Sequence, residues 1–194
     1  PIALNAKRFV PCFAGQNWQW DGVRFEMLHP GPWMNVATTN DNNRGCVLKI
    51  SSRAGSMLLP ADIEQETEFE LTRQSRDALA SDVLLAPHHG SKTSSSDAFL
   101  RAVQPQFIMV SAGYRNRFGH PKREILDRYV AAGAMVFRSD RDGAVGLRCL
   151  HQVGRTLGDP LQHRPHDLGP AAASGDAEQG AAGHAGRDRL DAVV

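Results

Sequence analysis

The chain has 194 residues and a formal net charge of +1, with 41% hydrophobic and 22% charged residues. These values are typical of a soluble globular domain, and the weak net charge excludes a global attraction to nucleic acid or anionic lipid. No apolar run approaches the roughly 20 residues that span a bilayer. The opening segment, which begins at Pro1, lacks the apolar stretch of a signal peptide, so we expect an excised piece of a longer protein.

The first half of the chain predicts strands followed by helix. Residues 23–28 alternate apolar and polar side chains, which indicates a half-buried strand ending at His29. Residues 46–50 and 56–59 predict two more strands, joined by a short turn that contains glycine. Residues 62–79 predict one or two amphipathic surface helices, with glutamates near the start, where the helix dipole favours them.

From residue 83 onward, strands and helices alternate. Ser96 is placed to cap the N-terminus of a helix, and Gly133 is placed to end another. The predicted strands are residues 83–86, 107–110, 135–137 and 144–147, and the predicted helices are residues 98–103 and 123–132. This alternation indicates an α/β layered domain.

Three cysteines, Cys12, Cys46 and Cys149, are widely and irregularly spaced. An odd and sparse set argues against a disulfide framework, and no Cys-x-x-Cys pair suggests a zinc ribbon. We expect buried thiols without a special role. The alternative is one disulfide, which requires that the domain faces an oxidising compartment.

Beyond residue 150 the composition changes to glycine, alanine, proline and charged residues with few large apolar side chains. Such a segment cannot bury enough area to offset the entropy of ordering it. We therefore predict a domain over residues 1–150 and a disordered tail over residues 151–194. His163, His166 and His184 lie in that tail, and we expect no metal-binding role for them.

Two adjacent histidines, His88 and His89, follow a predicted buried strand, which is where α/β folds place their functional sites. Neighbouring side chains point in different directions, so one histidine can bind a metal while the other contacts a substrate. Ser91, Lys92 and Thr93 offer hydrogen-bond donors to phosphate oxygens. The alternative is a polar loop with a capped histidine, and the abrupt change from strand to Pro-His-His-Gly-Ser argues against it.

Two further places carry candidate chemistry. Asp62 lies between a predicted strand and a predicted helix, where a carboxylate can bridge two metal ions, although it could simply cap the helix. Residues 114–121 gather two arginines, which suit phosphate recognition, and His120, which can act as a general acid. The alternative for this loop is a solvated basic turn.

The order of these motifs resembles the metallo-β-lactamase-fold domain of the ComEC family of DNA-uptake competence proteins. The resemblance covers residues 17–150 and rests on the segments 43–48, 86–96, 111–113, 116–121 and 140–144, together with Asp62 after its strand. It implies the C-terminal half of a four-layer αββα sandwich. The expected half is one mixed sheet with helices on one face and an apolar other face, which the missing N-terminal half would cover.

The resemblance also implies roles for individual residues. Asp62 and His89 match metal ligands, and His88 and His120 match catalytic histidines near the substrate phosphate, with the choice of ligand between His88 and His89 left open. His29 could stand where some enzymes of this fold keep a further ligand, but the favoured alternative is that the proline-rich turn explains its position. The residues expected to bind substrate are Ser91, Lys92, Thr93, Ser111, Asn116 and Arg117. The implied reaction is hydrolysis of a phosphodiester by two divalent ions, zinc or manganese, which degrades one strand of incoming DNA during transformation.

The chain departs from the family pattern in its metal motif. The sequence His-x-His-x-Asp-His does not occur, and Ala61 stands where the family has glycine before the bridging aspartate. We therefore expect an incomplete two-ion site whose other ligands come from the missing half. The expected partners are single-stranded DNA, that half, and the channel of a parent protein in the bacterial inner membrane, with this domain on the periplasmic side.

Two other functions remain open. One is a different hydrolase of the same fold, such as a phosphorylcholine esterase, which shares the His-His-Gly-Ser loop. The other is a non-catalytic module that contacts DNA through the local basic patch of Arg115, Arg117, Lys122 and Arg123.

Overall fold

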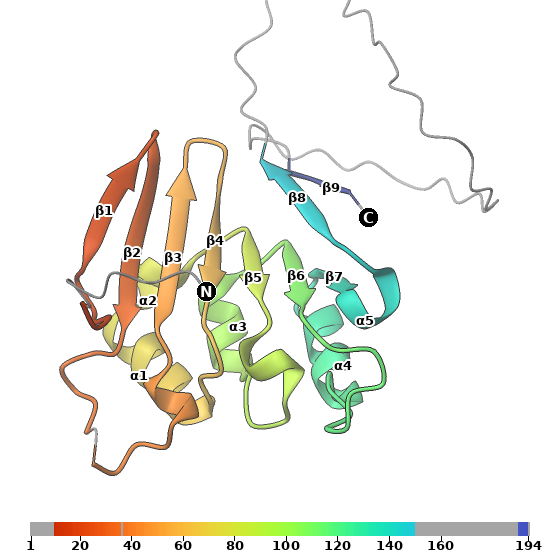
Figure 1. Cartoon of the computed structure of the whole chain (residues 1–194), viewed down its shortest axis with the longest axis horizontal. Coiled ribbons are helices and arrows are strands. Elements are labelled where there is room, and N and C mark those ends of the chain that lie inside the picture. Colours follow the sequence, from red (N-terminus) through yellow and green to blue (C-terminus); the bar gives the residue numbers. More distant parts are fainter. Residues whose placement is uncertain (1–9, 36, 150–189, 194) are drawn as a thin grey trace, which may run out of the picture.

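The computed structural model describes residues 10–35, 37–149 and 190–193. Seven strands form one sheet whose spatial order follows the chain (Figure 1). The strands are β1 (Asn17–Trp20), β2 (Val23–His29), β3 (Val47–Ser52), β4 (Gly55–Leu59), β5 (Val83–Leu85), β6 (Phe107–Val110) and β7 (Met135–Arg138). Strands β1 to β4 pair antiparallel, whereas β4 to β7 pair parallel, so the sheet is mixed.

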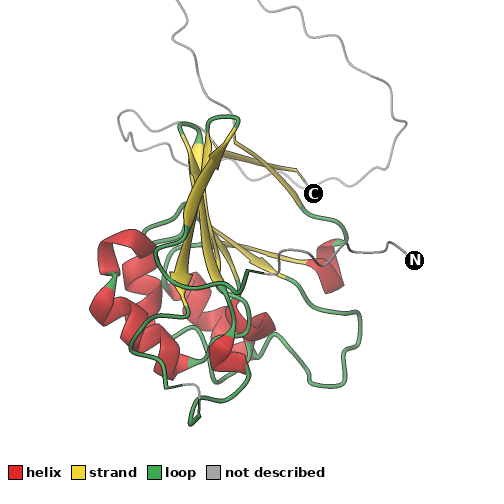
Figure 2. Ribbon diagram, turned by 60° about the vertical axis from the view of Figure 1, so that its left-hand side comes forward, coloured by secondary structure: helices red, strands yellow, loops and turns green. Residues whose placement is uncertain are grey.

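The helices α1 to α4 cover one face of this sheet (Figure 2). They are α1 (Gln65–Gln74), α2 (Arg76–Leu79), α3 (Asp97–Val103) and α4 (Arg123–Ala131), and a short α5 (Ser139–Asp142) follows β7. One apolar core fills the space between helices and sheet; its fully buried side chains include Leu58, Leu84, Ile108, Leu71, Phe99 and Ile125. None of the helices in the described ranges has the length and hydropathy that crossing a membrane requires.

The opposite face of the sheet is also apolar. Side chains alternate along a strand, and Leu58, Leu84 and Ile108 point into the core beneath the helices, so their neighbours point the other way. The residues on this open face are Trp18, Phe25, Met27, Leu48, Ile50, Met57, Leu59, Val83, Leu85, Phe107, Met109, Met135 and Phe137. The predicted arrangement, one mixed sheet with helices on one face and apolar side chains on the other, is confirmed for the described residues.

Four elements differ from the prediction. Strand β1 was not predicted, because all four of its residues are exposed at the sheet edge and leave no buried face to detect. The predicted helix over residues 62–79 begins at Gln65 and is interrupted at Ser75, whose backbone angles are not helical. The short helix α5 lies between the predicted strands 135–137 and 144–147 and was not predicted. The second of these strands is shifted by two residues, to Gly146–Cys149.

The C-terminal part of the chain is described only in part. Strand β8 (Gly146–Cys149) pairs antiparallel with β9 (Leu190–Val193) in a separate two-stranded sheet. The rest of the predicted tail, with His163, His166 and His184, lies outside the described residues.

Cys12 and Cys46 form a disulfide with their Cα atoms 6.1 Å apart, within the usual range. The expectation of unpaired thiols is therefore wrong for these two residues, and the alternative of one disulfide holds. Backbone hydrogen bonds from Ala14 to Pro30 and from Gly15 to Met27 place the N-terminal segment beside the end of β2. Because β2 pairs with β3, this contact brings together two cysteines 34 residues apart.

Candidate functional site

The predicted site residues gather at one edge of the sheet. Asp62 follows β4, the pair His88 and His89 follows β5, and Ser111 and His120 follow β6. Because β4, β5 and β6 run parallel, their C-terminal ends lie at the same edge, where α/β folds place ligands.

Asp62 and His89, the two residues expected to bind metal, lie close together. The Nε2 atom of His89 lies 3.5 Å from Oδ1 of Asp62, and both side chains are about half exposed, at 51% and 48%. The other ring nitrogen, Nδ1, lies 2.7 Å from the backbone oxygen of Ser111. An N–H donated to a backbone carbonyl fixes the ring orientation of many metal-binding histidines and leaves Nε2 as the free ligand atom. Ser111 thus orients His89 through its main chain.

Asp62 does not cap the helix that follows it. Helix α1 has Glu64 at its N-cap position, without a side-chain hydrogen bond there, so the capping alternative fails. Ala61 has a φ of 54°, in the left-handed region that favours glycine. This conformation turns the chain between β4 and Asp62, and it is the position at which the resembling family has glycine.

Glu64 is a site residue that the sequence analysis missed. Its Oε1 atom accepts a hydrogen bond from Thr93 at 2.9 Å and lies 3.4 Å from Nδ1 of His88. Its other oxygen accepts from Asn40 at 2.9 Å, and Asn42 donates to Oε1 at 3.3 Å. Although burial acts to raise the pKa of Glu64, these hydrogen bonds and the nearby His88 hold it below its usual value. The signal in the sequence was an asparagine-rich turn upstream of a glutamate two residues after Asp62.

His120 lies beside His88, with ring centroids 5.9 Å apart in an edge-to-face arrangement. Its Nδ1 atom is buried and has no hydrogen-bond partner in the part of the chain that the structure describes. Burial first, and then the positive charge of Lys122 and the neighbouring histidines, lower the pKa of His120. These effects favour the neutral form of the ring, whose Nδ1 atom is left without a hydrogen bond to the described residues.

A close approach of two loops joins His88 to His120. Gly90 has a φ of 78°, and a Cβ atom placed on it would lie 2.6 Å from Cβ of Pro121. Its carbonyl oxygen accepts a hydrogen bond from the backbone of Lys122 at 2.9 Å. Only glycine permits both the backbone conformation and this contact.

The residues predicted to bind substrate are not all available. Ser91 is buried and hydrogen-bonded to Thr93, which is itself bonded to Glu64. Asn116 uses its amide inside its own loop, as described below. Lys92 and Arg117 are exposed and free to meet a ligand.

His29 is fully buried, and both of its ring nitrogens are occupied. Nε2 lies 2.8 Å from the backbone oxygen of Asn43, and Nδ1 accepts from the backbone N–H of Gly31. Burial lowers its pKa. His29 therefore supports the turn after β2 and has no ring nitrogen left to bind a metal.

The ligand count is too small for a resident metal. No group of three or more metal-binding side chains exists among the residues that the structure describes, and Asp62 and His89 are two. Protein zinc sites use three or four protein ligands, so these residues alone do not fit a metal ion, still less two.

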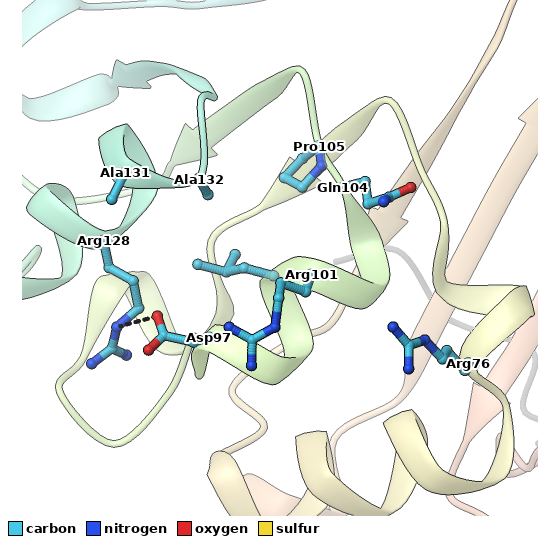
Figure 3. A pocket seen from close by; sticks show the side chains of 9 residues that line it. Arg76, Asp97, Arg101, Gln104, Pro105, Arg128, Ala131 and Ala132 are labelled. Carbon is cyan, nitrogen blue, oxygen red and sulfur yellow. Dashed lines mark ion pairs between the residues drawn. The ribbon is translucent and has the colours of Figure 1, made fainter.

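A cavity of about 670 Å³ lies apart from this site, between α2, α3 and α4 (Figure 3). Arg76, Arg101 and Arg128 line it, and Arg128 is paired with Asp97 at 3.3 Å. Its lining also includes Gln104 and Pro105, which precede β6, and Ala132, which precedes β7. The cavity therefore lies toward the N-terminal ends of the parallel strands. The candidate site is at their C-terminal ends.

Curated proteins that are similar to this chain include the following three. "Competence protein ComA" of Neisseria gonorrhoeae is 39% identical over 68% of the chain, "Recombination protein 2" of Haemophilus influenzae is 36% identical over 60%, and "ComE operon protein 3" of Bacillus subtilis is 34% identical over 72%. The chain spans 19%, 14% and 18% of their respective lengths. No known family's sequence profile matches it. The chain is therefore homologous to a short segment of much longer proteins, one of which is named a competence protein and another a protein of the ComE operon.

Proposed function

We propose that this chain is the C-terminal half of a metallo-β-lactamase-fold domain in a ComEC-like DNA-uptake protein. The complete domain is a metal-dependent nuclease that degrades one strand of incoming DNA during transformation. The observation that carries the proposal is the meeting of Asp62 and His89 at the ends of adjacent strands, with His88 and His120 beside them. This is the arrangement of a hydrolytic site with part of its ligand set.

Three other observations support the proposal. The homologous segments belong to proteins named for competence and recombination. The open sheet face is apolar over seven strands, as expected of a surface that a second half-domain covers. The Cys12–Cys46 disulfide is typical of domains outside the reducing cytosol, which agrees with a periplasmic location in an inner-membrane protein.

A second function is favoured by the shortage of ligands. With no group of three or more metal-binding side chains among the described residues, the chain by itself suits a non-catalytic module that contacts DNA. Such a module would show salt-dependent affinity for DNA without metal-dependent cleavage.

The test compares this chain with one extended upstream in the parent protein through the missing half-domain. We expect zinc- or manganese-dependent cleavage of single-stranded DNA by the extended chain alone. Asp62→Ala and His89→Ala should each abolish cleavage and lower the bound metal per chain, whereas Asp127→Ala, an exposed carboxylate on α4, should change neither. An extended chain that binds metal without cleaving DNA would overturn the nuclease proposal and favour the non-catalytic module.

A further inference from the structure

The loop between β6 and α4 carries two exposed aromatic side chains next to the candidate site. Tyr114 is 74% exposed and Phe118 is 61% exposed. Side chains this exposed bury little apolar area, so the two rings contribute little to the stability of the fold. They lie in a segment, residues 113–123, that contains four cationic and no acidic side chains.

Each ring is paired with an arginine. The guanidinium of Arg115 lies 5.2 Å from the ring centre of Tyr114, and that of Arg117 lies 4.8 Å from the ring centre of Phe118. Neither arginine forms an ion pair with a carboxylate in the described part of the chain. A planar cation over an exposed ring occupies the place where a nucleobase would stack. Once displaced, it remains beside the base and can bind a phosphate.

The loop is held in one shape by its own polar groups. Nδ2 of Asn116 donates to the backbone oxygen of His120 at 2.7 Å, and Oδ1 accepts from the backbone N–H of His120 at 2.9 Å. The Lys122 ammonium group donates to the backbone oxygen of Phe118 at 2.7 Å. The aromatic rings are thus presented by an ordered turn, which lowers the entropy lost when a ligand binds.

Phe118 connects this loop to the candidate site. Phe118 is stacked on His120, with centroids 5.9 Å apart and ring planes within 13°. His120 in turn meets His88 edge to face at 5.9 Å. A base stacked on Phe118 would therefore lie close to His120 and the candidate site.

We propose that Tyr114 and Phe118 form a stacking platform for the bases of single-stranded nucleic acid, with Arg115 and Arg117 binding the flanking phosphates. The platform selects single strands because the base faces of a duplex are already stacked on each other. The inference rests on the proposed function for its biological setting, but the platform itself requires no metal and no catalysis.

The experiment measures binding of fluorescent oligonucleotides to the 194-residue chain in the presence of EDTA, so that no cleavage occurs. The two probes are a thymidine 15-mer and an abasic 15-mer, which has the same number of phosphates and no bases. We expect the thymidine probe to bind more tightly. Tyr114→Ala and Phe118→Ala should each weaken its binding roughly 5- to 100-fold, the range for loss of one base–aromatic stack, and leave the abasic probe unaffected.

Matched variants separate stacking from folding and from charge. Phe118→Tyr should retain binding and Phe118→Leu should lose it, while Phe69→Ala, which removes an equally exposed ring from α1, should have no effect. Arg117→Ala should weaken both probes and reduce the salt dependence by about one phosphate contact.

Two results would overturn the platform. One is equal affinity of the wild-type chain for both probes. The other is unchanged oligonucleotide binding by Phe118→Ala together with lower stability of the upstream-extended chain, which would assign the rings to a protein interface. Because binding is measured without metal, absence of cleavage by the extended chain would remove the nuclease proposal and leave this one standing.

Discussion

Glu68 in α1 is a carboxylate with no exposed surface, placed directly beneath the serine-rich loop that follows the two site histidines. Its two oxygens accept hydrogen bonds from the backbone N–H groups of Ser95 and Ser96. Arg128 donates to the backbone oxygen of Ser95 at 2.6 Å, and Tyr129 bonds the Ser95 hydroxyl at 2.6 Å. These contacts hold Ser95 at a positive φ of 59° and fix the loop behind the site.

Burial raises the pKa of Glu68 above 4.5, although the hydrogen bonds and Arg128 oppose the shift. The folded protein therefore binds this proton more tightly than the unfolded chain does. Glu68 contributes most to stability below the unfolded pKa, and that contribution is lost as the pH rises through the raised folded pKa.

We expect Glu68→Gln to lower the free energy of unfolding by about 1–3 kcal/mol at acidic pH, because the amide NH₂ would face a backbone N–H. The difference from wild type should shrink as the pH rises, measured by urea unfolding at a series of pH values. Glu124→Gln, on the exposed surface of α4, serves as the control. A difference that grows with rising pH would show that the carboxylate is not destabilised by burial.

The sequence identified the candidate metal-binding and catalytic residues better than the residues whose hydrogen bonds hold them in place. Asp62, His88 and His89 could be found because each follows an apolar strand, and strand ends meet at one edge of a parallel sheet. Glu64 and Glu68 were missed because in the sequence they are two of several glutamates in a predicted amphipathic helix, and the asparagine-rich turn upstream of Glu64 does not by itself single it out. Their importance depends on contacts with Thr93, Ser95 and Ser96, which are 27 to 29 residues away.

At the scale of elements, the strands with one buried face and the helices with clear stop signals were predicted almost to the residue. Strand β6 occupies the predicted residues 107–110, and Ser96 caps α3 by accepting a hydrogen bond from the backbone of Phe99. The short edge strand β1 was missed because an edge strand gains its stability from one neighbour, here β2, and not from burial.

The disulfide belongs to the scale of elements, and the irregular spacing of the cysteines did not predict it. It ties the segment before β1 to the residue preceding β3, three positions after Asn43. Oδ1 of Asn43 accepts a hydrogen bond from the backbone N–H of Glu64 at 2.7 Å. The covalent link thus stabilises the turn that supports one side of the candidate site.

We expect the double variant Cys12→Ser/Cys46→Ser to be less stable than the oxidised wild type by about 3–4 kcal/mol, the chain-entropy value for a loop of this length. The measurement is urea unfolding with and without dithiothreitol. Reductant should lower the wild-type midpoint to that of the double variant and leave the variant unchanged. Equal midpoints for oxidised and reduced wild type would mean that the bond adds no stability.

At the scale of the whole molecule, the sheet has two apolar faces and helices on one of them. Proteins rarely leave a large contiguous apolar surface in water. The homologous proteins are more than five times as long as the matched segment. The proposed half-domain therefore requires that another segment of the same polypeptide covers the open face, and this segment is the expected occupant. Figure 2 shows the sheet with α1 to α4 on one side and the short α5 on the other. Residues from the segment 139–145 line a pocket with Leu85, Met109 and Phe137 of the open face, so the occupant would cover the remainder of that face.

Ile50 tests this arrangement, because it lies on the open face of β3 between Phe25 and Met57. In the chain alone, Ile50→Glu should reduce self-association in sedimentation experiments and change the free energy of unfolding by less than about 1 kcal/mol, as for a surface position. In the upstream-extended chain, the same change would bury an unpaired charge and should cost several kcal/mol. Leu58→Glu, which points into the helix-covered core, should destabilise both chains. If Ile50→Glu has the same small effect in both, the upstream segment does not pack on this face, and the half-domain proposal loses its structural basis.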